Sequence, residues 1–181
     1  AELWWGRSPA NDELLQERFG AAVSAAAAGV LDHWTGSPRG RLALILLLDQ
    51  LPRAIHRGTA PAFATHAKAL ETARRRLDSG ADRLLRSIER VFLYLPFEHS
   101  EHLTDQDLSV ALFRGLRDTV PEQQRGPFAT FLDYAERHRE VIARFGRFPH
   151  RNAILGREST PEEAEFLAEP GASLLRSNVE R

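Results

Sequence analysis

The chain has neither cysteine nor methionine among its 181 residues. The absence of cysteine excludes thiol nucleophiles, disulfides and cysteine-ligated metal centres, and it leaves the redox compartment undecided. No apolar run approaches the roughly 20 residues that a membrane-spanning helix needs, and no signal-peptide pattern opens the chain. We therefore expect a soluble, cytoplasmic protein with no membrane partner. Because no initiator methionine is present, we also expect the N-terminus to be incomplete.

An excess of charge of either sign is missing too. The 24 basic and 25 acidic residues give a formal net charge of −1 at pH 7. The chain thus lacks the overall basic field that holds nucleic acid or acidic membranes, and we expect no nucleic-acid partner. Only Lys68 among the basic residues is a lysine, a skew that codon bias toward GC commonly produces. A cluster of arginines must therefore be judged by its surroundings.

Apolar residues recur at helical spacing along nearly the whole chain. Helices are predicted over residues 11–28, 59–80, 82–96, 104–121 and 128–146, followed by a short helix that Thr160, Pro161 and Glu163 open. A capping box of Thr104 with Asp107 is predicted to start the 104–121 helix. About seven to nine helices with no alternating strand pattern predict an all-α fold of antiparallel helix pairs. We expect residues 1–181 to form one domain.

The run LALILLLDQL, residues 42–51, is apolar on all sides until it reaches Asp49. Its leucine and alanine content, and the lack of a second strand pattern to pair with it, favour a buried helix over a buried strand. We expect Pro52 to end this helix, because proline has no backbone N–H to donate. A carboxylate in such a run needs a partner, and Arg53 and Arg57 are near in sequence. Asp49 is either half of a buried ion pair or the floor of a ligand pocket.

Two segments carry charge of opposite sign. Residues 92–107 hold four acids and no Lys or Arg: Glu98, Glu101, Asp105 and Asp107. Residues 141–157 hold four arginines and no acid: Arg144, Arg147, Arg151 and Arg157. Two roles stay open for these arginines. They fasten helix ends by bidentate pairing with the carboxylates, or some of them face a pocket and bind a carboxylate or phosphate group.

His138 interrupts the apolar stripe of the predicted 128–146 helix, one turn after Tyr134. A histidine on an apolar face is commonly a core residue whose polar atoms are satisfied by the protein. A buried imidazole near a carboxylate such as Glu98 is also how a general base is tuned toward neutral pH. Both interpretations of His138 stay open.

The sequence EHSEH, residues 98–102, raises the question of a metal site. On a helix His99 and His102 would share one face. The spacing is neither the Glu-x-x-His of di-iron bundles nor His-Glu-x-x-His. Acids that complement a helix dipole explain the glutamates more simply, so we predict no metal. Since the chain also lacks a phosphate-binding Gly-rich loop, a nucleophile elbow and a dinucleotide fingerprint, we predict no cofactor.

Several long motifs together carry a resemblance to a known family. They are WWGRSPANDELLQERFG, LALILLLDQLPRAIHRG, RVFLYLPFEHSEHLTDQD and FLDYAERHREVIARFGRFPHRNAILGRESTPEE. This series resembles the bacterial family catalogued as domain of unknown function 924, and it covers nearly the whole chain. The resemblance implies an all-helical fold related to tetratricopeptide-like helix hairpins. It also implies that DQ-x-PR, LPFEHSE, the 134–138 helix and RFGRFPHRN are shared blocks.

We expect these polar blocks to form an interior cleft that binds a small anionic molecule. The expected ligand contacts are Asp49, Arg53, His99, Arg144, Arg147, His150, Arg151 and Asn152, and the expected acid/base groups are Glu98, Tyr134 and His138. If the protein is an enzyme, these side chains support proton transfer without a cofactor. One alternative is a peptide- or protein-interaction module of the helical-hairpin type, although no 34-residue repeat is present. The other is that the polar blocks are purely structural.

Overall fold

A computed structural model describes residues 8–78 and 80–169. Its α-helices are α2 (Pro9–Ala27), α3 (Pro38–Ile45), α4 (Leu51–Ile55), α5 (His66–Asp78), α6 (Ser87–Glu98), α7 (Leu103–Thr119), α8 (Arg125–Phe145) and α9 (Pro161–Ala168). No strand occurs in these two ranges, so the predicted all-α fold is confirmed. No helix in the part of the chain just defined is both long and apolar enough to cross a membrane.

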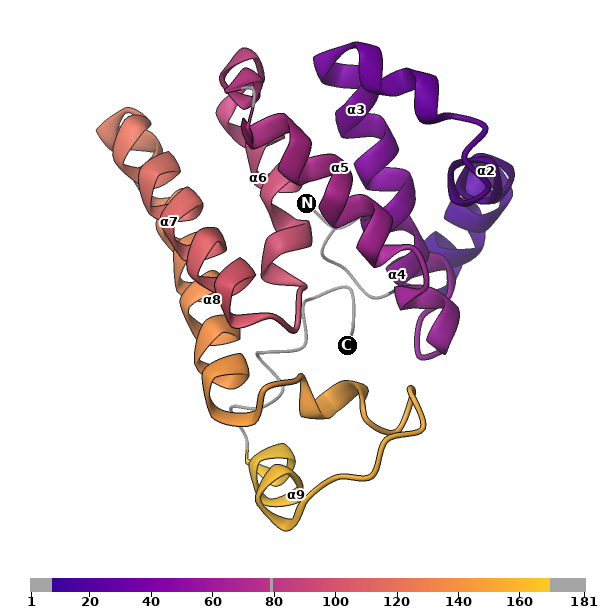
Figure 1. The fold of residues 1–181 in the computed structure, drawn as a ribbon, viewed down its shortest axis with the longest axis vertical. Helices are drawn as coiled ribbons and strands as arrows, with labels where there is room; N and C mark the ends of the chain where they lie inside the picture. The colour runs from indigo at the N-terminus through magenta and orange to yellow at the C-terminus, as the bar shows by residue number, and fades with distance from the viewer. Residues whose placement is uncertain (1–7, 79, 170–181) are drawn as a thin grey trace.

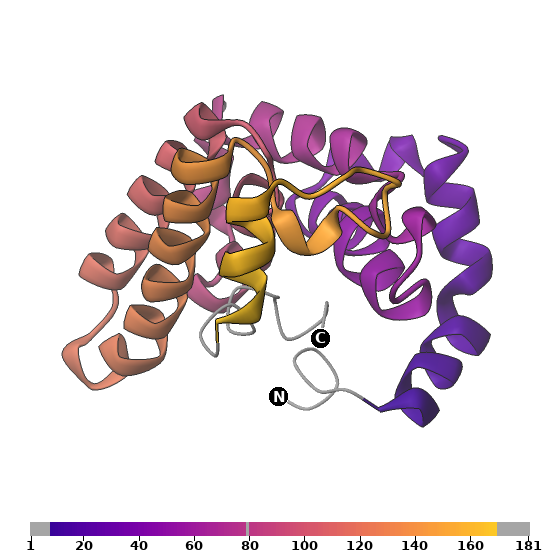
Figure 2. The same cartoon turned by 90° about the horizontal axis from the view of Figure 1, so that it is seen from below.

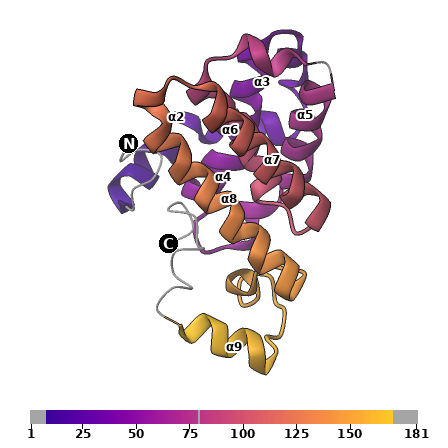
Figure 3. The ribbon, with the colours of Figure 1, turned by 90° about the vertical axis from the view of Figure 1, so that its left-hand side faces the viewer.

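Helices that follow one another in the chain pack against one another. α7 and α8 lie side by side along one flank, and α6 packs against α7 (Figures 1 and 3). α2 and α4 pack together at the opposite edge (Figure 1). The segment between α8 and α9 leaves the end of α8, runs toward α4 and then returns to α9 (Figures 1 and 2). This excursion brings residues far apart in the sequence close to α4.

Buried apolar side chains form three clusters, and two of them reach polar residues that the sequence singled out. One cluster lies among α5, α6, α7 and α8 and includes Phe97, and another lies among α2, α3 and α4 and includes Leu48. A third cluster contains Phe148 and residues of α8. Leu48 and Phe97 directly precede the buried acids Asp49 and Glu98, so the polar residues begin where the apolar core ends.

Pro52 does not end the helix, contrary to the sequence prediction. Leu46–Gln50 form a π-helical turn, in which the N–H of Leu51 donates to the carbonyl of Leu46, five residues earlier. In a regular helix proline has no N–H for the ladder, and its ring clashes with the preceding turn. The wider π turn admits Pro52, and the chain continues as α4. The same turn carries Asp49.

Pro96 also lies inside a helix, α6, which continues to Glu98. All residues from 93 to 100 are buried, so packing on every side stabilises the helix through the proline. Two apolar residues near the start of the predicted 82–96 helix, Leu84 and Ile88, are 74% and 46% exposed. Leu84 belongs to the 3-10 turn η4 (Ala81–Leu84), and Ile88 lies in the first turn of α6, before the core encloses the helix.

The predicted helix over residues 59–80 is divided in two. It consists of a 3-10 turn, η3 (Ala60–Phe63), and the helix α5. The Thr59 hydroxyl donates to the carbonyl of His56 at 2.7 Å, so it closes the preceding turn and does not cap the helix. The division leaves Phe63 at the end of a short turn, beside the polar residues described below.

Of the two capping boxes that the sequence predicts, one is present and the other is not. Thr160 and Glu163 form the predicted capping box of α9, with a hydrogen bond in each direction. The predicted box of Thr104 with Asp107 is wrong. His102 precedes α7, and no side-chain hydrogen bond caps that end.

Gly146 ends α8 in the left-handed conformation, with φ of +68°, as the sequence predicts. We expect Gly146→Ala to lower the free energy of unfolding by about 1–2 kcal/mol, because an L side chain is strained at this φ. Gly115→Ala, in the interior of α7, is the matched control, since a Cβ would meet no atom within 4 Å at either position. It should raise the free energy of unfolding by about 0.5–1 kcal/mol. Urea unfolding measures both, and equal effects of the two variants would contradict the assignment.

Candidate functional site

Asp49 is a carboxylate that is only 1% exposed. Its Oδ2 lies 2.7 Å from His99 Nδ1 and 3.1 Å from Gln50 Nε2. Its Oδ1 accepts hydrogen bonds from Nε and Nη2 of Arg53, both at 3.2 Å, and lies 3.3 Å from His66 Nδ1. One carboxylate therefore connects the π turn, α4, the start of α5 and the C-terminal end of α6.

These neighbours determine the protonation state of Asp49. Burial by itself would raise the pKa of the carboxyl group, since an apolar environment disfavours the charged form. The electrostatic attraction of His99 and Arg53, with the hydrogen bonds from His66 and His99, outweighs burial and holds this pKa well below its usual range. Asp49 is therefore ionised at neutral pH and accepts all of these hydrogen bonds.

Phe63 makes cation–π contacts with two buried guanidinium groups. The Arg53 guanidinium carbon is 5.2 Å from the centre of the Phe63 ring, and that of Arg151 is 4.9 Å away. Arg151 also lies 4.3 Å from the ring centre of Phe148 and donates from Nη1 to the carbonyl of His99 at 3.0 Å. Cation–π contacts of this kind are strengthened by removal from water. They bring two arginines that are distant in sequence against the same ring.

A small pocket opens beside this arrangement, and we call it the basic pocket. Its volume is about 140 Å³, and its wall consists of Arg53, Arg57, Gly58, Ala62, Phe63, His150 and Ile154. Arg57 is held from behind by Asp12, which accepts from Nε at 2.8 Å and from Nη2 at 2.9 Å. Among the residues that the structure describes, the charged groups in this wall are basic, and no carboxylate lines it.

Glu98 and His138 lie together elsewhere in the interior. Both are buried, with His138 Nδ1 3.5 Å from Glu98 Oε1 and 2.8 Å from the backbone carbonyl of Tyr134. The shorter contact shows that this N–H is donated mainly to the helix backbone. Tyr134 thus takes part through its carbonyl. These three predicted acid/base residues do not line the basic pocket.

Three of the predicted ligand contacts hold α9 in place. Arg147 donates from Nε and Nη2 to Glu163 at 2.6 and 2.8 Å, and Asn152 Nδ2 donates to the same carboxylate at 3.1 Å. Arg144 donates to Glu162 at 2.9 Å. These residues therefore fasten the start of α9 to the end of α8. Of the predicted ligand contacts, two line the basic pocket: Arg53 and His150. Three others lie behind the pocket: Asp49, His99 and Arg151. The remaining three lie outside it: Arg144, Arg147 and Asn152.

The ion pair of Glu101 with Arg157 joins the two segments of opposite charge. Glu101 accepts from Nη1 and Nη2 of Arg157 at 2.7 and 3.0 Å and from the backbone N–H of Phe148 at 2.9 Å. Burial by itself would raise the pKa of Glu101, but the bonds from Arg157 and Phe148 and the nearby charge of Arg151 lower it on balance. Two other acids pair outside the basic segment: Asp105 with Arg74 and Asp107 with Arg139.

The sequence patterns miss three parts of this arrangement. Phe63 falls inside the predicted 59–80 helix, and no local pattern signals that two arginines will lie against its ring. His66 was not considered as a partner of Asp49, from which it is 17 positions away. Arg57 was noted only as a neighbour of Asp49, whereas it pairs with Asp12 and forms part of the pocket wall. The i,i+4 spacing of Asp49 and Arg53 was the one usable signal.

Comparison with known proteins places the chain in a family. Residues 1–171 match the family described as "Bacterial protein of unknown function (DUF924)". The chain belongs to the DUF924 family. A solved structure of a protein of unknown function, ATU0120 from Agrobacterium tumefaciens, shares 41% sequence identity with it at a TM-score of 0.81. The similarity covers 91% of this chain and 88% of that one. The comparison with curated proteins gives no match.

The blocks that carried the resemblance to the DUF924 family converge in space. DQ-x-PR contributes Asp49 and Arg53, LPFEHSE contributes His99, and RFGRFPHRN contributes His150 and Arg151. They come together because the return from α8 to α9 passes beside α4 (Figure 2). The remaining arginines of RFGRFPHRN bind the acids of α9.

The Arg147 pair yields a pH-dependent prediction. The hydrogen bond from Arg147, with those from Thr160 and Asn152, lowers the pKa of Glu163 from its ordinary 4.5 to about 2. Because the folded pKa lies below the unfolded one, the stabilisation is present above pH 4.5 and is lost as pH falls toward 2. At pH 7 Glu163→Gln should lower the free energy of unfolding by about 1.5–3 kcal/mol. Unfolding at several pH values should show the gap to wild type narrowing in acid.

Glu162→Gln is the matched control for this prediction. Its pair with Arg144 is 48% and 59% exposed on the two side chains, so its removal should change the free energy of unfolding by less than about 0.5 kcal/mol. A loss at Glu162 as large as that at Glu163, or a Glu163 effect that does not vary with pH, would refute the assignment.

Proposed function

We propose that this protein binds a small anion, through a carboxylate or phosphate group, in the basic pocket. The observation that carries the proposal is the composition of the pocket wall. Arg53, Arg57 and His150 come from two distant parts of the sequence and line one hollow, which no described acid lines. Converging basic groups in a concave site are the usual means of recognising an anion.

The pairing of the arginines with acids is consistent with this role. A guanidinium carries five N–H donors in a rigid plane, so one group can bind several acceptors at the same time. Asp49 orients Arg53 from inside the protein, and Asp12 orients Arg57. An arginine that is already held loses less side-chain entropy when a ligand binds.

The size of the pocket limits the ligand. Its volume of about 140 Å³ is well below the roughly 300–1,000 Å³ of sites for drug-sized molecules. The ligand group is therefore compact, and the Phe63 ring gives it a flat apolar wall. The buried Asp49–His99 pair lies behind Arg53 and does not line the pocket, so we assign this pair a positioning role.

Two variants that break the same ion pair test the proposal. Arg57→Gln removes a basic group from the pocket wall, and calorimetric titration with inorganic phosphate and acetate should show at least about tenfold weaker binding, or 1.4 kcal/mol. Asp12→Asn breaks the same Arg57–Asp12 pair but keeps the arginine, so binding should be unchanged or tighter.

Both variants lose the stability that the Arg57–Asp12 pair provides. The difference in anion affinity between them therefore decides the outcome. If neither anion binds the wild-type protein above a chloride control of equal ionic strength, the proposed function is wrong. Equal weakening by Arg57→Gln and Asp12→Asn would also refute it, since the pair would then act only on the fold.

A further inference from the structure

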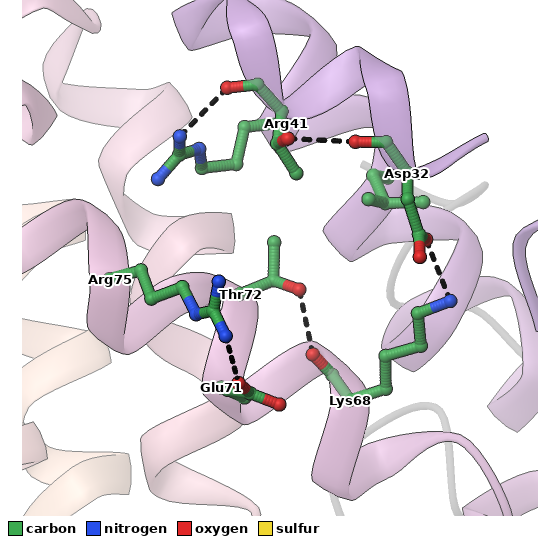
Figure 4. Close-up of a pocket in the computed structure, with 8 residues that line it drawn as sticks. Asp32, Arg41, Lys68, Glu71, Thr72 and Arg75 are labelled. Carbon is green, nitrogen blue, oxygen red and sulfur yellow. Dashed lines mark hydrogen bonds and ion pairs between the residues drawn. The ribbon is translucent and has the colours of Figure 1, made fainter. Parts of the chain in front are cut away.

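We propose a second binding site, for a small zwitterion of the α-amino-acid type, in a polar hollow among η1 (Asp32–Gly36), α3 and α5. The hollow has a volume of about 220 Å³ and is lined by Asp32, Thr35, Arg41, Leu44, Lys68, Glu71, Thr72 and Arg75 (Figure 4). None of these residues lines the basic pocket, so this inference does not rest on the proposed function.

Arg41 supplies the first cationic group of the hollow. Its Nη2 donates to the carbonyl of Thr35 at 2.7 Å, which ties η1 to α3. Its Nε is buried, yet it has no hydrogen-bond partner within the described chain. No described carboxylate lies within ion-pair distance of the Arg41 guanidinium, whereas the Arg75 guanidinium pairs with Glu71. The Arg41 Nε is out of reach of a molecule in the hollow, but the Arg41 side chain lines the hollow, and a ligand carboxylate there would supply the counter-charge that the described residues do not.

Arg75 provides a second donor on the same side of the hollow. It projects from α5 below Arg41, which comes from α3, and both guanidinium groups face the space between the helices (Figure 4). Its only described carboxylate partner is Glu71, and the two side chains are 73% and 62% exposed. Exposed pairs of this kind contribute little to stability. Arg75 can therefore exchange Glu71 for the carboxylate of a ligand.

Hydrogen-bond acceptors are found across the hollow. The Asp32 carboxylate lies on the side opposite the two guanidinium groups, paired with Lys68 at 2.7 Å (Figure 4). The hydroxyls of Thr35 and Thr72 donate to the carbonyls of Asp32 and Lys68, both at 2.7 Å. Since each hydroxyl hydrogen is already used, these oxygens present only lone pairs to the hollow. Such oxygens suit an ammonium group.

The arrangement of donors and acceptors identifies the ligand class. A molecule that carries a carboxylate near an ammonium group would match the arginines on one side and Asp32 with Thr72 on the other. The lining holds three basic and two acidic side chains, an excess of one positive charge, so the carboxylate is the stronger anchor. The volume of about 220 Å³ suits a small amino acid.

Amide chemical shifts can test this site in the intact chain. Titration with L-alanine, L-serine and L-glutamate should produce saturable shifts at residues 35, 41, 72 and 75 for at least one of them. Acetate and ethylamine, which each carry one of the two charges, should bind at least tenfold more weakly than that amino acid. Arg41→Gln and Arg75→Gln should each weaken its binding at least tenfold.

Two controls keep this result separate from other effects. Arg114→Gln removes an exposed arginine that pairs with Glu136 at 2.8 Å elsewhere on the surface, and it should leave amino-acid binding unchanged. Arg57→Gln, in the basic pocket, should leave it unchanged too. Failure of anion binding at the basic pocket would therefore not be mistaken for failure here.

The inference is overturned if none of the three amino acids gives saturable shifts at these residues. It is equally overturned if acetate binds as tightly as the amino acid, because the ammonium group would then not be recognised. If Arg41→Gln proves unfolded, Arg75→Gln decides the matter, since that side chain is largely exposed. Wild-type affinity in folded Arg75→Gln would contradict the site.

Discussion

The ionised carboxylate of Asp49 is the interaction on which the arrangement of the interior depends. Through its bonds to Arg53, His66 and His99 it connects four parts of the chain around one buried charge. Removing one partner of a buried ion pair typically costs about 3–5 kcal/mol, because the other charge is left uncompensated. The π turn that carries Asp49 lets the helix continue through Pro52, which a regular α-helix would not accommodate. The π turn thus places the Asp49 carboxylate where the run of apolar residues ends.

From this charge the arginines divide into two groups with different roles. Arg53 is held by Asp49, stacks on Phe63 and reaches the basic pocket, where Arg57 and His150 join it. Arg144 and Arg147 bind acids of α9 and fasten that helix to α8. Arg157 performs a similar task at Glu101. The arginine-rich segment is therefore mainly structural at its ends, and its middle turns toward α4 and the pocket.

Local chemistry made part of this account predictable from the sequence. The end of α8 at Gly146 and the capping box of α9 depend on residues within a few positions of one another. Asp49 and Arg53, four positions apart, could be paired for the same reason. Pro52 and Pro96 misled the prediction because tertiary packing and a π turn overrode a local rule. The Phe63 contacts and the His66 contact depend on how distant helices meet, which no local spacing encodes.

The most direct test of the central role of Asp49 is the titration of its side-chain carboxyl carbon by NMR in the folded protein. The account predicts that the midpoint of the Asp49 titration lies well below the ordinary aspartate value of 3.8, because His99 and Arg53 hold the charged form. An Asp49 midpoint at or above its ordinary value of 3.8 would contradict the account, because the buried charge would then not be held by its basic neighbours.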